Sequence, residues 1–138
     1  YRPNTTYGPW EPEGVPLSIN EHGFVDNGNE FPNLIHKPEG TTRVFVLGGS
    51  SLVGTGASSN HMTIPAKLEA ILNKKGSYEV INAGVDGYQA SQERMYLLSD
   101  IIYYHPDIVV FYDGGNDYGH PVFSGGYRDE YQKSHAKL

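Results

Sequence analysis

The sequence predicts an α/β protein in which a parallel sheet lies between two layers of helices. Three short apolar runs, at residues 43–47, 78–81 and 107–112, have the composition of buried strands. Two segments with apolar residues at helical spacing, 63–74 and 89–104, separate them. Strands and helices that alternate in this way are typical of a parallel sheet with right-handed crossovers. Because three strands give little sheet, we expect only part of a three-layer α/β/α domain.

The first forty residues differ in composition from the rest of the chain. Six of the nine prolines fall within residues 1–40, and proline at this density interrupts regular ladders. We therefore expect an irregular N-terminal arm or linker over 1–40 that could contain one short strand, followed by the domain at 41–138. Three aromatic residues of the arm are expected to attach it to the domain: Trp10, Phe24 and Phe31.

The first strand and the first helix have clear signals at both ends. Residues 43–47 (RVFVL) are apolar and β-branched, and two glycines follow them. In 63–74, Pro65 is acceptable in the first turn and Gly76 lies just beyond the end. The apolar positions of this predicted helix are Ile64, Leu68, Ile71 and Leu72.

The second half of the predicted sheet follows the same order. Residues 78–81 form the second strand, and the helix over 89–104 is ended by His105-Pro106 before the third strand at 107–112. Residues 118–138 are polar and glycine-rich, and no regular element is expected there. The predicted apolar face of the second helix consists of Met95, Leu98, Ile101 and Ile102.

Composition excludes several classes of function. The chain has no cysteine, so disulfide and thiolate chemistry are absent, and its net charge of −6 argues against binding to nucleic acid or anionic membranes. The apolar runs are far shorter than the ~20 residues of a membrane-spanning helix. No Cys, His or carboxylate cluster has metal-ligand spacing, and we expect neither metal nor cofactor.

Chemistry-bearing residues follow each predicted strand at its carboxyl end. These are 48–51 (GGSS), 82–87 (NAGVDG) and 114–117 (GGND), and parallel strands bring such loops to one edge of the sheet. A serine nucleophile requires donors for the developing oxyanion, which backbone N–H groups and an asparagine amide can supply. The sequence therefore indicates Ser50 as nucleophile and Asn116 as one donor.

The three loops, in this order, resemble the first three motifs of the SGNH/GDSL hydrolase superfamily. Residues 48–50 are similar to its Gly-Asp-Ser motif, with Gly49 at the position where Asp is commoner. The resemblance covers residues 43–117, and 20–24 (NEHGF) also resembles the lead-in of some bacterial members. It assigns the oxyanion glycine to Gly87 and the Gly-x-Asn-Asp motif to Gly114, Asn116 and Asp117.

This resemblance implies a flavodoxin-like SGNH fold and serine-dependent hydrolysis of carboxylic esters. The implied substrate is a small or carbohydrate ester, and a secreted or extracytoplasmic bacterial location is slightly favoured. Asp117 is expected to organise its loop by hydrogen bonds. The implied site consists of Ser50 as nucleophile, Ser50, Gly87 and Asn116 as oxyanion hole, and Gly48, Gly49, Gly114 and Asp117 as supporting loop residues.

The family's fourth motif, a C-terminal Asp-x-x-His that supplies the general base, is missing. Asp129 is followed three places later by Gln132, and the same glutamine stands three places before His135. Without a base the Ser50 hydroxyl is a weak nucleophile. Together with Tyr1 in place of an initial methionine, this predicts that the chain is a fragment, nearly inactive alone, with its base elsewhere.

Four histidines could in principle replace the missing base. His61 and His120 are expected at the same edge of the sheet as Ser50, whereas His105 precedes a strand and is expected at the opposite edge. His135 lies in the segment without a predicted element. Loop histidines are usually solvated, and none of the four is a convincing base.

Three other interpretations remain open. Ser50 is also explained as a helix-capping or turn residue. A phosphate-binding turn at 48–54 is disfavoured, because it lacks the lysine that follows the last glycine of a P-loop. The same fold could serve as a non-catalytic binding or assembly domain, or could transfer an acyl group to a polysaccharide hydroxyl.

Overall fold

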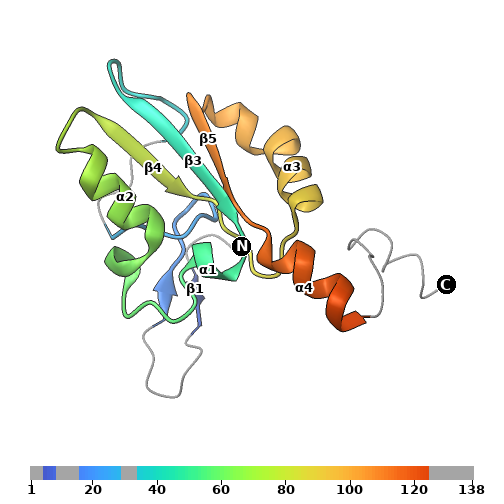
Figure 1. The fold of residues 1–138 in the computed structure, drawn as a ribbon. Helices are drawn as coiled ribbons and strands as arrows, with labels where there is room; N and C mark the ends of the chain where they lie inside the picture. The colour runs from blue at the N-terminus through green and yellow to red at the C-terminus, as the bar shows by residue number, and fades with distance from the viewer. Residues whose placement is uncertain (1–4, 9–15, 29–33, 125–138) are drawn as a thin grey trace.

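The computed structural model describes residues 5–8, 16–28 and 34–124, with the side chains of 120–124 left out (Figure 1). Two short antiparallel strands lie in the N-terminal arm, where only one was expected, and they precede a parallel sheet and its helices. The elements are β1 (Thr6–Tyr7), β2 (Leu17–Ser18), β3 (Thr42–Gly48), α1 (Ser50–Val53), η1 (Asn60–Met62), α2 (Ile64–Leu72), β4 (Tyr78–Asn82), α3 (Ala90–Ser99), η2 (Ile101–Tyr104), β5 (Ile108–Tyr112) and α4 (Gly115–Ser124).

The main sheet has three strands in the order β4-β3-β5, and both pairings are parallel. In the central strand, Val44 is opposite Val80 of β4 and Ile108 of β5. The helices α2 and α3 lie on either side of the sheet (Figure 1). The prediction of an α/β protein with a parallel sheet flanked by helices is therefore confirmed.

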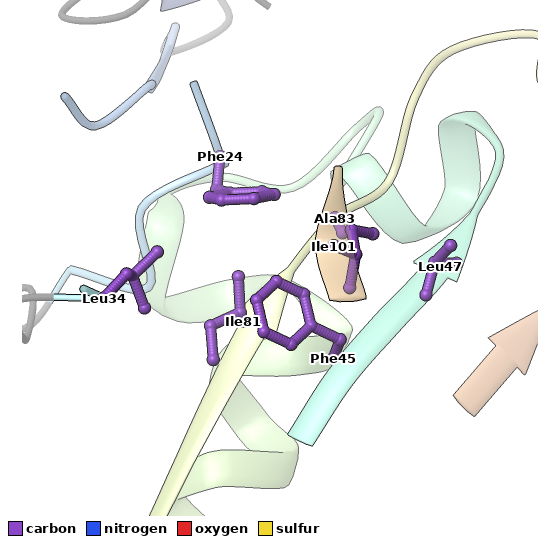
Figure 2. Packing of buried hydrophobic residues seen from close by; sticks show 7 residues of the cluster. All are labelled: Phe24, Leu34, Phe45, Leu47, Ile81, Ala83 and Ile101. Carbon is purple, nitrogen blue, oxygen red and sulfur yellow. The ribbon is translucent and has the colours of Figure 1, made fainter. Parts of the chain in front are cut away.

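The central strand is buried on both faces because its side chains alternate between two helical layers. Phe45 and Leu47 pack in the cluster drawn in Figure 2, which continues onto the α3 side. Val44 and Val46 pack on the opposite side, with Leu52 of α1. A continuous apolar run is what a strand covered on both faces requires.

The N-terminal segment contributes to the same core. Phe24 and Leu34 are buried beside Phe45, and the rings of Phe24 and Phe45 meet edge to face with centroids 5.5 Å apart. The Asn27 side chain donates a hydrogen bond of 2.6 Å to the backbone oxygen of Val80. Phe24 thus attaches the segment to the domain as expected, while Trp10 and Phe31 lie outside the described residues.

The predicted helix over 89–104 is wrong in two respects. It ends at Ser99, and a separate 3₁₀ turn, η2, covers Ile101–Tyr104. The residue between them, Asp100, has φ −131° and ψ −57°, which breaks the helical path. Because the predicted apolar face is therefore not one surface, only Ile101 is buried, and three of its members are at least half exposed: Met95, Leu98 and Ile102.

A helix also forms where none is predicted, since α4 spans Gly115–Ser124. Its start is fixed by contacts with the rest of the chain, because the Asp117 carboxylate accepts hydrogen bonds from the backbone N–H of Ala90. Tertiary contacts commonly override the low helix propensity of glycine. None of the described helices has both the length and the apolar character needed to cross a bilayer.

The third strand is less buried than its composition suggests. Val109 packs against the core, whereas Ile108, Phe111 and Tyr112 are about half exposed. The described strands pair with β5 along one edge only. An apolar edge strand of this kind normally requires a cover.

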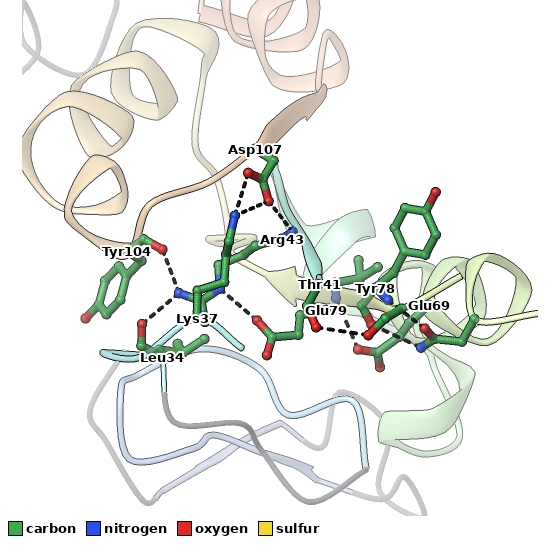
Figure 3. A network of polar contacts seen from close by, with 12 residues as sticks. Leu34, Lys37, Thr41, Arg43, Glu69, Tyr78, Glu79, Tyr104 and Asp107 are labelled. Carbon is green, nitrogen blue, oxygen red and sulfur yellow. Dashed lines mark hydrogen bonds and ion pairs between the residues drawn. The ribbon is translucent and has the colours of Figure 1, made fainter. Parts of the chain in front are cut away.

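A buried ion pair lies at the amino end of the sheet (Figure 3). The fully buried Arg43 donates through Nε to the Glu79 carboxylate at 2.8 Å and through Nη1 to the backbone oxygens of Leu34 and Tyr104, both at 2.7 Å. These contacts tie three separate parts of the chain to β3. A buried guanidinium is tolerated only when paired and hydrogen-bonded in this way.

A second, more exposed ion pair lies nearby. Lys37 is 2.6 Å from the Asp107 carboxylate, which also accepts the backbone N–H of Arg43 at 2.7 Å. Hydrogen bonds from Lys37 and from the Arg43 backbone lower the pKa of Asp107 below its ordinary value. Both partners are partly solvated, so the Lys37–Asp107 pair is expected to add little to stability.

Replacing Glu79 by alanine tests the importance of the buried pair. The Arg43 guanidinium would remain buried without its counter-ion, and we expect the free energy of unfolding in urea to fall by about 3 kcal/mol or more. The matched control is Lys37→Ala, for which we expect a loss of about 1 kcal/mol or less. Equal losses of unfolding free energy in the two variants would contradict the view that the buried pair matters more than the exposed one.

Candidate active site

A cavity of about 250 Å³ opens at the carboxyl ends of β3 and β5. Its walls come from the start of α1, the turn before α3, the last residue of β5 and residues 113–116, which lead into the first turn of α4. The strand order places these pieces together, as expected for an open parallel sheet. The lining residues are Gly49, Ser50, Ser51, Tyr88, Tyr112, Asp113, Gly114, Gly115 and Asn116.

Ser50 is the first residue of α1, and Gly49 is its N-cap with no side chain to bond the helix. The N–H groups of Ser50 and Ser51 therefore belong to the first turn, where no helical carbonyl is available to them. The short helix is held from below by Asn82, whose amide donates to the backbone oxygens of Leu52 and Val53 at 3.1 and 3.3 Å. Ser50 is thus partly exposed on a fixed turn.

The Asn116 side chain lies directly beside this turn. Its Nδ2 donates a 2.7 Å hydrogen bond to the backbone oxygen of Tyr88, and a Cβ built on Gly49 would lie 2.5 Å from the same nitrogen. The side chain of any other residue at position 49 would therefore collide with the amide. Since Nδ2 carries two hydrogens, one N–H beyond the bond to Tyr88 remains for another acceptor.

The other predicted loop residues take different places. Gly48 pairs with Tyr112 in the sheet and is not among the lining residues, while Gly114 lines the cavity with φ +109°. Gly87 also has a left-handed backbone, with φ +74°, but it is not among the lining residues. From the loop that contains Gly87, it is the next residue, Tyr88, that lines the cavity.

The segment 113–117 rests on the N-terminal turn of α3. Both carboxylate oxygens of Asp117 accept the backbone N–H of Ala90 at 3.2 Å, and the Gln89 amide donates to the backbone oxygen of Asn116 at 3.5 Å. Asp117 therefore organises this segment, as the sequence suggested. An acidic side chain at a helix N-terminus also interacts favourably with the helix dipole.

Glu93 is a buried acid of this region that the sequence did not indicate. It lies on α3 one turn beyond Gln89, and its side chain is 1 % exposed. Burial raises the pKa of Glu93 to about 7, with further contributions from the carboxylates of Asp113 and Asp117. The predicted apolar face, with Met95 and Leu98, is on the other side of the helix, whereas Tyr96 and Leu97 pack against the core, and Leu97 lies one turn from Glu93.

No histidine belongs to the cavity wall in the part of the chain that the structure describes. The ring of His61 lies against Gly28, where a Cβ would be 2.3 Å from its Cε1, and His105 precedes β5 at the opposite end of the sheet. The His120 side chain and the whole of His135 fall outside the described residues. Within the same limits, no three His, Cys, Asp or Glu residues are grouped to hold a metal ion.

No protein-family model matches the chain, and no curated protein matches it.

Replacing Gly49 by alanine tests whether close packing at this position fixes the Asn116 amide. The added methyl group would displace Nδ2 and break its hydrogen bond to Tyr88, so we expect the Asn116 side-chain amide protons to lose protection in NMR hydrogen exchange.

The matched control is Gly115→Ala, because a Cβ at Gly115 would meet nothing within 4 Å. This variant should leave the Asn116 amide unchanged. Similar behaviour of the two variants would contradict the role given to Gly49.

Proposed function

We propose that the protein is a serine ester hydrolase with an SGNH-type fold. The observation that carries this proposal is the contact between the Asn116 amide and Gly49, which sets a side-chain donor beside the serine that begins α1. Both groups line one cavity at the carboxyl edge of a parallel sheet. A hydroxyl group next to fixed N–H donors is the arrangement that acyl transfer from an ester requires.

In the proposed reaction the Ser50 Oγ attacks the ester carbonyl carbon and loses its proton to a base. The negative charge on the carbonyl oxygen is stabilised by the N–H of Ser50 and the second Nδ2–H of Asn116, with Gly87 as a third donor on the motif resemblance. The C–O bond to the alcohol then breaks and the alcohol leaves with the proton. Water releases the acid from the acyl-serine in the reverse sequence of proton transfers.

The general base is expected from outside the described residues. Tyr88 and Asp113 line the cavity, but no described histidine does so. Histidine is the usual base for a serine nucleophile, because its ordinary pKa allows it to accept and return a proton near neutral pH. Stabilisation of the oxyanion alone leaves only a small part of the catalysis.

The cavity favours a small acyl group over a long lipid chain. A volume of about 250 Å³ is just below the usual range of ligand sites, and two aromatic residues, Tyr88 and Tyr112, form part of its wall. Tyrosine combines an apolar ring with a hydroxyl group and suits contacts with a polar alcohol such as a sugar. An acylated carbohydrate is therefore the preferred substrate.

A non-catalytic binding domain is the second candidate function. The lack of a histidine among the described lining residues favours it over a complete hydrolase. Acyl transfer to a sugar hydroxyl would use the same groups as hydrolysis. Product analysis with a sugar acceptor separates transfer from hydrolysis, and a protein without reaction at Ser50 would be a binding domain.

Replacing Ser50 by alanine tests the proposed nucleophile. The full-length protein should react with a fluorophosphonate probe, and the Ser50→Ala variant should lose all labelling, because the probe bonds only to an activated hydroxyl. Ser77→Ala, at the opposite end of the sheet, should be labelled like the unchanged protein. Labelling that survives in Ser50→Ala, or no labelling of the full-length protein, would refute the nucleophile.

Replacing Asn116 by alanine tests the proposed oxyanion donor. We expect kcat for a small ester to fall by roughly 10²–10³-fold with little change in KM, since the bond to Asn116 strengthens as the oxyanion forms. Steady-state kinetics on the full-length enzyme measure both constants. A change confined to KM would show that Asn116 binds the substrate without stabilising the transition state.

A further inference from the structure

The segment 113–117 lies across the first turn of α3 and is held there by backbone and side-chain contacts. Asn116 bonds the backbone oxygen of Tyr88, its own backbone oxygen accepts the Gln89 amide, and Asp117 accepts the N–H of Ala90. Residues four apart share one face of a helix, so Glu93 lies on the same face of α3 as Gln89. All these contacts belong to one cluster of polar groups between α3 and the segment.

The Glu93 carboxyl group has an unusual environment for an acid. Its side chain is buried, and neither carboxyl oxygen receives a hydrogen bond from a donor among the described residues. The group with which it interacts is another acceptor, the Asp113 carboxyl. Two carboxyl groups can share a hydrogen bond only when one of them holds a proton.

The surrounding charges also oppose ionisation of Glu93. Asp113, from the loop after β5, and Asp117, from α4, both act on Glu93 with negative charge. The other elements packed on α3 contribute apolar groups to the core, such as Leu47 of β3 and Ile101 of η2. None of the ion pairs among the described residues includes Glu93, so an ionised side chain would be a buried anion without a counter-ion.

We propose that Glu93 is a positioning residue whose uncharged carboxyl group donates a hydrogen bond to Asp113 and thereby holds the segment 113–117, with Asn116, against α3. This inference concerns the segment itself and does not depend on whether Ser50 is a nucleophile. Glu93 does not line the cavity and acts only through Asp113.

The attachment of the segment 113–117 to α3, called the closed form below, should weaken as the pH rises. In the closed form the pKa of Glu93 is about 7, compared with 4.5 for the free group, so the closed form binds the proton more tightly. Closure is therefore most favourable below pH 4.5, becomes weaker between pH 4.5 and 7, and is constant above pH 7. The linkage predicts a loss of protection between pH 5 and 8 that reaches at most about 70-fold, the limit in which opening of the segment fully solvates Glu93.

The test is NMR hydrogen exchange of the backbone amides of 113–117 and the Asn116 side chain in the full chain, corrected for intrinsic exchange. In the unchanged protein, the protection of these amides from exchange should fall as the pH rises. Glu93→Gln keeps the shape and a donor for Asp113 without titrating, so its protection should be independent of pH. Asp100→Asn, which removes a charge from the other end of α3, should behave like the unchanged protein.

A second measurement keeps the proposal falsifiable if Glu93→Gln fails to fold. The ¹³C resonance of the Glu93 carboxyl carbon in the unchanged protein should titrate with a midpoint near 7. A midpoint near the ordinary value of 4.5 would overturn the proposal. Equal pH dependence of protection in Glu93→Gln and in the unchanged protein would also overturn it.

Discussion

The candidate site depends on the close pairing of β3 with β5 at their carboxyl ends. Gly48 of β3 is opposite Tyr112 of β5, and a Cβ at Gly48 would lie only 2.4 Å from the backbone oxygen of Tyr112. The two strands can therefore approach each other only because residue 48 is glycine. Both strands end at this contact. β3 continues into α1 and β5 into the segment 113–117, and the cavity lies between these two continuations.

Side-chain amides hold the two parts of the chain that follow the paired strands, α1 after β3 and the segment 113–117 after β5. Asn82 holds α1, while Asn116 and Gln89 join the segment 113–117 to the turn before α3. A neutral amide can donate and accept at once, which suits positions where backbone groups from different elements meet in a buried region. Ser50 and Asn116 are thus held by contacts outside the cavity, and the hydroxyl and the second amide N–H are left available to a ligand.

The sequence predicts the strands well because a buried parallel strand is a continuous apolar run, and each of the three runs forms a strand of the sheet. It predicts the helix faces poorly. Apolar periodicity assigned Met95 and Leu98 to the core, whereas the buried face of α3 carries Glu93, whose pKa is raised by burial and by Asp113 and Asp117, which are distant in the sequence. The start of α4 likewise depends on Asp117 and Ala90, a contact that no local pattern contains. The motifs at the strand ends indicated Ser50 and Asn116, and the structure brings both to one cavity.

We propose that Ser50 and Asn116 act on the same reacting group. The most direct test is a crystal structure of the full-length protein after reaction with a phosphonate ester inhibitor, whose phosphorus mimics the tetrahedral intermediate. The account predicts a covalent bond from phosphorus to Ser50 Oγ, with the phosphoryl oxygen within hydrogen-bond distance of Asn116 Nδ2 and the Ser50 N–H. Phosphorus bonded to another side chain, such as Ser51, or a phosphoryl oxygen directed away from Asn116, would contradict it.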